Sequence, residues 1–330
     1  MEQTLLDNQI ISETQLESVN INTNNRFIES NTQQVGLTHL KQDCIIPVFA
    51  KDNESTIAHY EFIEAVREVT KLLYPNHSVT MPNIRVSHIV KGRIPSAIRK
   101  PANQLKEHEK TIYYERMAFM IEIPEIATYV SGNRLNLTIG GVRSYSEQNL
   151  FSKKTLEKFK LFIGFKNMVC CNLCIATDGL IDNLRLSSVD DIRAHTRRLI
   201  LDYDHERQAS ILNQLQEYTL NQEQFAHLVG KMKLYNQLDA HKKQDLFDLQ
   251  ITDAQINSII KNYASDNNFH ADENGYVNLW QLYNLFTESA KSNYIDNFLV
   301  RNCNAFGFVD HLSQAIKANK TDYFLQAHEI

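Results

Sequence analysis

The 330-residue sequence lacks the features that mark membrane, secreted and DNA-coating proteins. No apolar run approaches the roughly 18–20 residues of a membrane-spanning helix, and the N-terminus has neither the basic nor the apolar region of a secretory leader. Its 34 basic residues face 39 acidic ones, and the formal charge of −5 argues against a generally basic DNA-coating protein. Five cysteines, an odd number, suit a reducing compartment. We therefore expect a cytoplasmic protein without membrane contact.

The sequence also lacks local catalytic motifs. It contains no Walker loop, dinucleotide fingerprint, nucleophile elbow or His-Glu-x-x-His helix, and its histidines are scattered. It therefore predicts no catalytic residue, no metal and no cofactor. Whether the protein is an enzyme stays open, and the balance favours a non-enzymatic role.

Glycine and proline are scarce, at 10 and 6 residues, which is consistent with long helices and short turns. Hydrophobic residues make up 43% and charged residues 22%, as in soluble globular proteins. Residues 1–40 differ, because they are polar and carry one basic residue against five acidic ones. Such a segment buries too little apolar surface to offset its ordering entropy, which predicts a disordered tail.

The chain is organised around the apolar residues 159–179, which contain three of the five cysteines. Their composition predicts two or three buried strands with a turn near Lys166 and Asn167. Within this stretch Asn167 and Asn172 either bond nearby backbone or contact a ligand. Cys171 and Cys174 have the spacing of half a zinc site or of a redox pair. Too few further ligands accompany them for zinc, and a redox pair would normally open a helix rather than lie in a strand, so packing is the favoured interpretation.

Earlier residues predict strands and one helix. Every second side chain in residues 117–123 and in residues 135–139 is large and apolar, and a Ser131-Gly-Asn turn lies between the two segments, which predicts a hairpin. Gly140 and Gly141 indicate a bulge or the end of that strand. A first strand is expected at residues 44–50, and an apolar stripe predicts a helix at residues 59–74.

From Ser188 onward the pattern is helical. Ser188 is expected to cap one helix, and capping boxes that begin at Thr219 and Thr252 predict helices at residues 221–236 and 253–263. Residues 272–278 only partly resemble a calcium loop, so a polar turn with Asn278 capping the next helix is favoured. In that helix, polar residues within one turn predict an interhelical hydrogen-bond network or, as the alternative, a catalytic or binding patch; they are Asn284, Thr287 and Glu288.

The clearest charge asymmetry is a run of six cations from Arg85 to Lys106 without an acidic residue between them. It is either a solvated flexible loop or a phosphate-binding flap. Pro95 and Pro101 favour loop over regular strand. Nearby tyrosines offer stacking surfaces for bases. The candidate nucleic-acid contacts are Arg85, Lys91, Arg93, Arg99, Lys100, Arg143, Tyr145 and Lys166.

Two stretches together resemble a known family. Residues 164–172 with Asp178-Gly179, and residues 279–288, resemble a "Val-Cys-x-Asn" core and a "Trp-x-Leu-Tyr-Asn-x-x-Thr" helix of phage- and plasmid-like proteins, with Arg143-Ser-Tyr145 ahead of the core. The chain is similar, over residues 41–325, to domain of unknown function 3871, which is related to the domain of unknown function 932 group. The resemblance implies residence on mobile genetic elements and transfers no active site.

These observations predict an α+β protein. A disordered tail (residues 1–40) precedes an antiparallel β-rich core with one early helix (residues 41–186), and a helical region (residues 187–330) packs on that core. The favoured function is single-strand DNA binding or annealing by a mobile-element protein. The alternatives are an interaction protein that assembles through its helices, with a homo-oligomer kept open, and an enzyme without a local motif.

Overall fold

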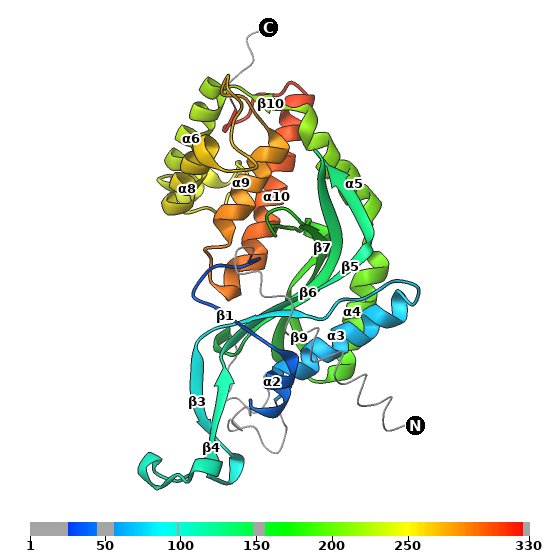
Figure 1. The fold of residues 1–330 in the computed structure, drawn as a ribbon. Coiled ribbons are helices and arrows are strands. Elements are labelled where there is room, and N and C mark those ends of the chain that lie inside the picture. Colours follow the sequence, from blue (N-terminus) through cyan, green and yellow to red (C-terminus); the bar gives the residue numbers. More distant parts are fainter. Residues whose placement is uncertain (1–25, 45–55, 98, 148–155, 326–330) are drawn as a thin grey trace.

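The computed structural model describes residues 26–44, 56–97, 99–147 and 156–325. An antiparallel sheet built by the first half of the chain curls against helices built mainly by the second half (Figure 1), which confirms the α+β class. Among the helices in these ranges, none combines the length and apolar content needed to cross a bilayer.

Seven strands form the main sheet, and every pairing within it is antiparallel. The order from one edge is β1, β2, β5, β6 and β7, and β8 and β9 share the far side of β7. Strand β7 therefore has neighbours on both sides, as an interior strand must to pair its backbone. The strands are β1 (Gln33–Val35), β2 (Asn83–Val86), β5 (Arg116–Val130), β6 (Asn133–Ser144), β7 (Glu157–Asn167), β8 (Leu173–Cys174) and β9 (Leu180–Leu186).

The central stretch forms β7, a turn and β8, as predicted. Phe159, Leu161 and Ile163 point to one face of β7 and are fully buried. The turn occupies residues 168–172, just after the expected position, and Cys171 adopts a left-handed conformation there (φ 60°). The buried interior strand on which the architecture depends is present.

The hairpin β5–β6 is also confirmed, but it runs further than predicted. Ser131 and Gly132 take positive φ values of 51° and 76° in the connecting turn. Gly140 and Gly141 do not end the strand, because β6 continues to Ser144. They are needed for close packing: a Cβ on Gly140 would lie 2.1 Å from the Phe119 carbonyl oxygen.

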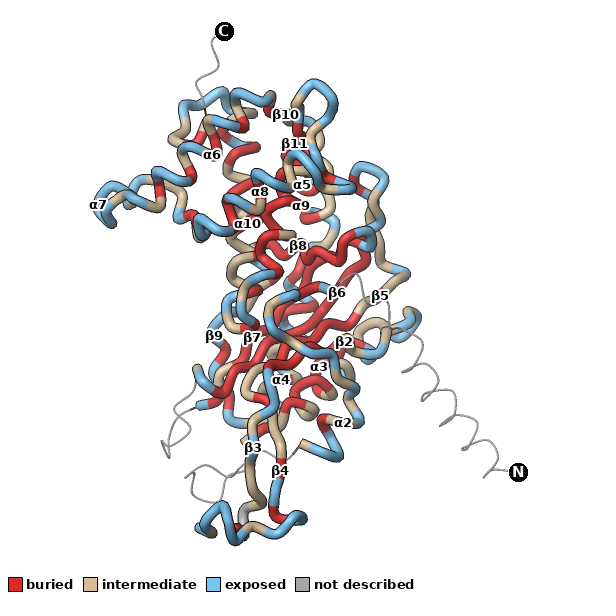
Figure 2. Tube along the Cα trace, turned by 60° about the vertical axis from the view of Figure 1, so that its left-hand side comes forward, coloured by how far each residue is buried: buried red, intermediate tan, exposed pale blue. Residues whose placement is uncertain are grey.

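Helices cover both faces of the sheet. Helix α3 (His59–Leu73), which confirms the predicted helix, packs with α4 (Val189–Asp202) on one face (Figure 2). There the Phe62 ring meets Phe119 and Phe159 edge-on, with centroids 5.2 and 4.9 Å away. On the opposite face α10 (Ile295–Lys317) buries Phe298 in a smaller apolar cluster. Packing on both faces explains why β7 has almost no exposed residue.

The helical half follows its capping signals. The Ser188, Thr252 and Asn278 side chains cap helices as predicted. The capping box predicted to begin at Thr219 begins instead at Asn221, because Thr219 pairs in a short strand with Asn278. The elements are α5 (His205–Gln214), β10 (Thr219–Leu220), α6 (Gln222–Asn236), α7 (Ala240–Lys243), α8 (Asp253–Ser265), β11 (Val277–Asn278) and α9 (Leu279–Ala290).

Order begins earlier than the composition predicts. Residues 26–40 were assigned to a tail, yet β1 pairs with β2 and α2 (Leu37–Gln42) follows it. Phe27 and Ile28 are buried in the cluster that contains α10. These few apolar residues find a preformed surface elsewhere in the fold, which composition does not show. Residues 1–25 and most of the expected strand at residues 44–50 lie outside the described residues.

Strands β3 (Ile89–Arg93) and β4 (Lys110–Tyr114) form a separate antiparallel hairpin. It projects from the body at the bottom of Figure 1, and we call residues 89–114 the arm. Three 3-10 turns (Pro95–Ala97, Ala102–Gln104 and Glu107–Glu109) lie between its strands. Pro95 and Pro101 thus fall in the connection, as expected, while the residues around it pair regularly.

Candidate functional site

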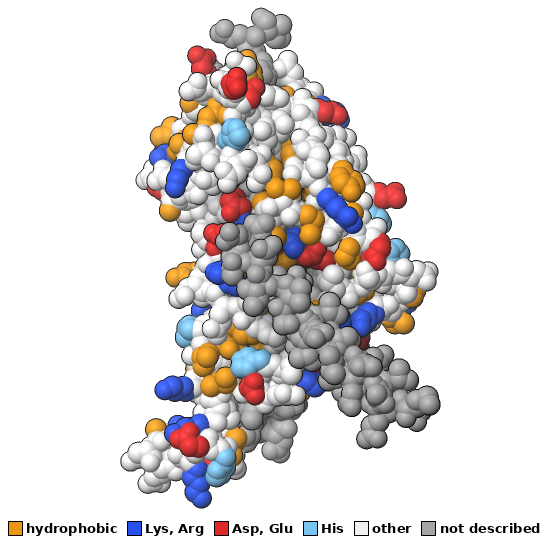
Figure 3. All heavy atoms as spheres, viewed as in Figure 1, with side chains coloured by type: hydrophobic (Ala, Val, Ile, Leu, Met, Phe, Trp, Pro, Cys, Tyr) orange, Lys and Arg blue, Asp and Glu red, His pale blue; other side chains and the backbone are white. Residues whose placement is uncertain are grey.

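The arm carries the strongest local charge in the chain. Residues 89–114 contain six cations and two acidic residues, a formal charge of +4 in a protein of −5. Figure 3 shows lysine and arginine side chains around its tip, and most of the residues between its strands are exposed. A projecting, positively charged hairpin is accessible to a polyanion from several directions.

Both acidic residues of the arm are paired within it. Lys100 contacts Glu109, and Lys110 contacts Glu107. The hydrogen bond from each lysine is the main cause that lowers the pKa of its glutamate partner. These pairs leave the surplus positive charge of the arm on other residues.

Four of the cations have no acidic partner. Within the described ranges, no carboxylate is in ion-pair contact with Lys91, Arg93, Arg99 or Lys106. Arg93 is half-buried and donates a hydrogen bond to the Lys100 carbonyl oxygen, whereas the other three side chains belong to exposed residues. These three are free to contact phosphate groups.

Arg143 and Tyr145 do not belong to this surface. Arg143 is 1% exposed, pairs with Glu157 and donates to the Ile57 carbonyl oxygen. Its guanidinium lies 4.5 Å from the Tyr145 ring centroid and 4.5 Å from that of Phe159. Tyr145 is itself 1% exposed, so both side chains are packed inside the protein and are not accessible to nucleic acid.

Arg85 and Lys166 are buried as well. Arg85 donates hydrogen bonds to Thr32 beside β1, at 2.7–3.1 Å. Lys166 forms a 2.6 Å ion pair with Glu122 across the sheet. Of the eight residues proposed from the sequence, the arm holds Lys91, Arg93, Arg99 and Lys100.

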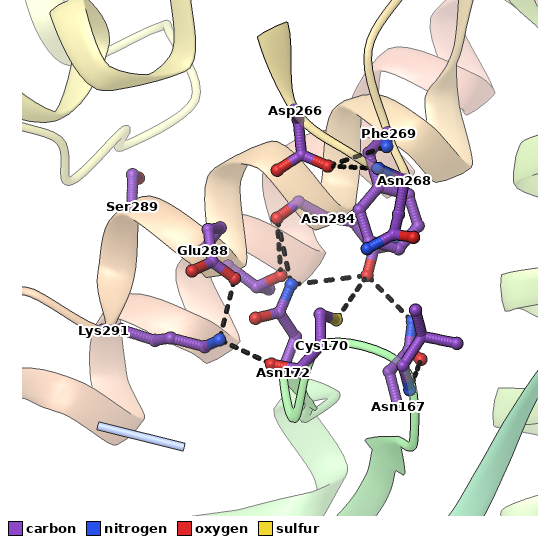
Figure 4. A network of polar contacts seen from close by, with 12 residues as sticks. Asn167, Cys170, Asn172, Asp266, Asn268, Phe269, Asn284, Glu288, Ser289 and Lys291 are labelled. Atoms are coloured by element: carbon purple, nitrogen blue, oxygen red, sulfur yellow. Dashed lines mark hydrogen bonds and ion pairs between the residues drawn. The ribbon is translucent and has the colours of Figure 1, made fainter. Parts of the chain in front are cut away.

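Three of the predicted residues, Asn167, Asn172 and Asn284, come together in a polar junction. We define the junction as these three with Cys170 and Lys291 (Figure 4). The Asn284 Oδ1 atom accepts hydrogen bonds from Asn167 Nδ2 at 3.2 Å and Asn172 Nδ2 at 3.4 Å. The Asn284 backbone carbonyl accepts from Asn172 at 3.1 Å. The junction therefore joins the β7–β8 turn to α9, rather than one helix to another.

Glu288 and Thr287 relate to the junction differently. Lys291 is 3% exposed, lies 2.8 Å from Glu288 and donates to the Cys170 carbonyl oxygen. Burial is the main cause that raises the pKa of Glu288, and the adjacent Lys291 opposes this rise. The Thr287 hydroxyl instead donates to backbone carbonyls of its own helix. Thr287 thus stabilises α9 without joining the turn.

Two buried titratable groups near these sites, Cys170 and His59, are held neutral. Burial raises the pKa of the Cys170 thiol to about 12, so it is a poor nucleophile near neutral pH. Burial also lowers the pKa of His59 to about 3, with the Arg143 charge adding to the effect. Among the described residues, no group of three or more His, Cys, Asp or Glu side chains could hold a metal ion.

Sequence reasoning missed the partners that decide these environments. Glu157, Glu122 and Lys291 were not singled out, although each determines whether a predicted residue is free or engaged. A signal existed for Lys291 only, because it follows Glu288 by three residues at a helix end. The other two pairings depend on strand register.

The fold and the two sites define an α+β protein with a basic projecting arm and a buried polar junction. The chain belongs to the family described as "Domain of unknown function, B. Theta Gene description (DUF3871)", which matches residues 5–325. This confirms the resemblance to domain of unknown function 3871 and extends it into the N-terminal segment. No curated protein and no solved structure matches the chain.

Proposed function

We propose that the protein binds nucleic acid through the arm, with single-stranded DNA as the preferred form. The observation that carries the proposal is the exposed set Lys91, Arg99 and Lys106 on a projecting hairpin, which has no carboxylate partner among the described residues. Phosphate contacts of this kind need no uniformly basic protein, because they act within about a Debye length of the arm. The negative charge of the body is therefore compatible with local binding.

Base stacking contributes less than the sequence indicates. Three tyrosines lie near the cations in the sequence. Tyr114 and Tyr145 are 2% and 1% exposed, and Tyr113 is half-buried. Affinity should therefore come mainly from phosphate contacts and depend weakly on base sequence. A role in handling the DNA of a mobile element is consistent with such binding.

The test is a fluorescence-anisotropy titration with single-stranded and duplex oligonucleotides at about 50 and 200 mM salt. The K91Q/R99Q/K106Q variant should bind more weakly, and its salt dependence on single strands should fall by about 2 in log–log slope, since each phosphate contact contributes about 0.7. The control is K242Q/K261Q/K317Q, which removes the same charge from exposed residues of the helical half and should bind like the wild type.

Equal weakening in both variants would show that net charge, not the arm, drives the interaction. Absence of binding at low salt would remove the proposal, and a stronger affinity for duplex would remove the single-strand preference. Measuring solution mass with and without DNA would detect the homo-oligomer that we propose as a second property.

A further inference from the structure

A pocket of about 190 Å³ opens between the turn Thr177–Gly179, α5 and α10. These elements lie in the upper part of Figure 1, away from the arm at the bottom. A cavity of about 150 Å³ can hold benzene, so this space suits a ligand of similar or slightly larger size. The lining residues used below are Asp178, Arg207, Gln208, Ile211, Phe306 and Asp310.

The wall of the pocket contains an unpartnered hydrogen-bond acceptor. Gln208 is 2% exposed, and its Nε2 donates to the Cys174 carbonyl oxygen at 2.9 Å. That bond fixes the amide orientation and leaves Oε1 as the remaining atom. Among the described residues, Oε1 has no hydrogen-bond partner. Oε1 is itself enclosed by protein atoms, so the amide fixes α5 to β8 at the pocket wall and offers no open acceptor to a ligand.

The pocket also brings together charges of both signs. Asp178 and Asp310 contribute carboxylates and Arg207 contributes a guanidinium. No ion pair joins Arg207 to either aspartate in the described part of the chain, and Asp310 accepts only long hydrogen bonds from Ser313 and Gln314 of its own helix. A ligand with one charge would meet repulsion from one side of the pocket, whereas a ligand with both charges would be complementary.

The remaining lining is apolar. Phe306 is 5% exposed, and Ile211 lies beside it in the pocket lining. Ligand pockets commonly combine such apolar walls with a few polar groups that fix orientation. An aliphatic group on the ligand would gain from burial against these two side chains.

We propose that this pocket binds a small zwitterion of the α-amino acid type with an apolar side chain. The ammonium group lies between Asp178 and Asp310. The carboxylate contacts Arg207, and the side chain packs against Phe306 and Ile211. The site is independent of nucleic-acid binding by the arm.

The probe is L-leucine, titrated calorimetrically into the full chain. Leucinamide lacks the carboxylate, 4-methylpentanoate lacks the ammonium and glycine lacks the apolar side chain, and each should bind at least about 10-fold more weakly, equivalent to about 1.4 kcal/mol. Both R207Q and D178N change exposed residues and should weaken leucine binding by a similar factor. R207Q should leave leucinamide binding unchanged, since that probe has no group for Arg207.

The control is R198Q, which removes an exposed cation from α4 and should bind leucine like the wild type. No saturation by leucine at about 10 mM would overturn the proposal, since even a Kd of 1 mM would be visible there. So would equal affinity for 4-methylpentanoate, or unchanged leucine binding in R207Q and D178N. DNA titration of R207Q should match the wild type, so failure here is distinguishable from failure at the arm.

Discussion

Cations of the sheet and cations of the arm occupy opposite environments. Arg143 and Lys166 are buried and ion-paired with glutamates from other strands. Lys91 and Arg99 are exposed and have no acidic partner in the described chain. The comparison shows that counting basic residues along the sequence locates the cations but does not show which of them are exposed and able to contact a ligand.

Strand register explains the difference. Val142 of β6 pairs with Lys160 of β7, which places Arg143 diagonally opposite Glu157 on the same face. Diagonal neighbours are within reach of long side chains. The arm contains only two strands, and its two glutamates engage Lys100 and Lys110. Neighbouring strands of the large sheet thus supply glutamate partners for its buried cations, whereas the two-stranded arm has fewer glutamates than cations and keeps a net positive charge.

The largest expected effect comes from breaking the buried pair of the body. The R143M variant removes the guanidinium that pairs with the buried Glu157 carboxylate, which should lower the free energy of unfolding by about 3–5 kcal/mol in urea denaturation. The R143M/E157L variant should recover much of this loss, because neither charge remains buried. Full stability in R143M would contradict the burial and pairing described above.

The polar junction should give the next largest effect. N284A removes the oxygen that accepts from Asn167 and Asn172, so the buried Asn167 amide loses its acceptor, whereas Asn172 keeps its bond to the Asn284 backbone carbonyl. We expect the free energy of unfolding to fall by about 3 kcal/mol. N297A changes an exposed asparagine of α10 and should differ from the wild type by less than about 0.5 kcal/mol. Similar losses in both variants would remove the special role of the junction.

The pH dependence of the free energy of unfolding tests the burial of His59. Burial lowers the pKa of His59 to about 3, whereas the unfolded value is about 6.5. Below about pH 6.5 the unfolded chain therefore binds a proton that the folded chain does not, so stability falls as the pH falls. Between about pH 6.5 and pH 4.5 this contribution is about 2–3 kcal/mol.

The measurement compares urea denaturation of the wild type and of H59Q across this pH range. The variant should lose less stability on acidification, because it lacks the titrating group. N297A changes an exposed residue that does not titrate and should keep the wild-type slope. Parallel slopes for wild type and H59Q would show that His59 titrates alike in both states.

The smallest effect on stability is expected from the arm. Removing the exposed cations in K91Q/R99Q/K106Q should change the free energy of unfolding by less than about 0.5 kcal/mol, as for most surface substitutions. Thermal denaturation alongside the DNA titration checks this. A large loss would show that these cations support the fold and would weaken the contrast with Arg143.

Local patterns predicted much of the fold. Alternation in β5 and β6, the apolar stripe of α3 and the caps at Ser188, Thr252 and Asn278 each act over a few residues, and each corresponds to an observed element. The grouping of Asn167 and Asn172 with Asn284 was not predictable. Their contact spans more than 110 residues and depends on how α9 packs against the β7–β8 turn.

The sequence by itself determined many of the elements, the order of a sheet-forming half before a helical half, and the positions of the charges, because these depend on neighbours along the chain. Only the tertiary structure decided which charges are neutralised, where Phe27 and Ile28 pack, and that Gln208, Arg207 and two aspartates line one pocket. The physical reason is that burial and pairing arise between segments far apart in sequence, whose distance is fixed only when the sheet and helices pack.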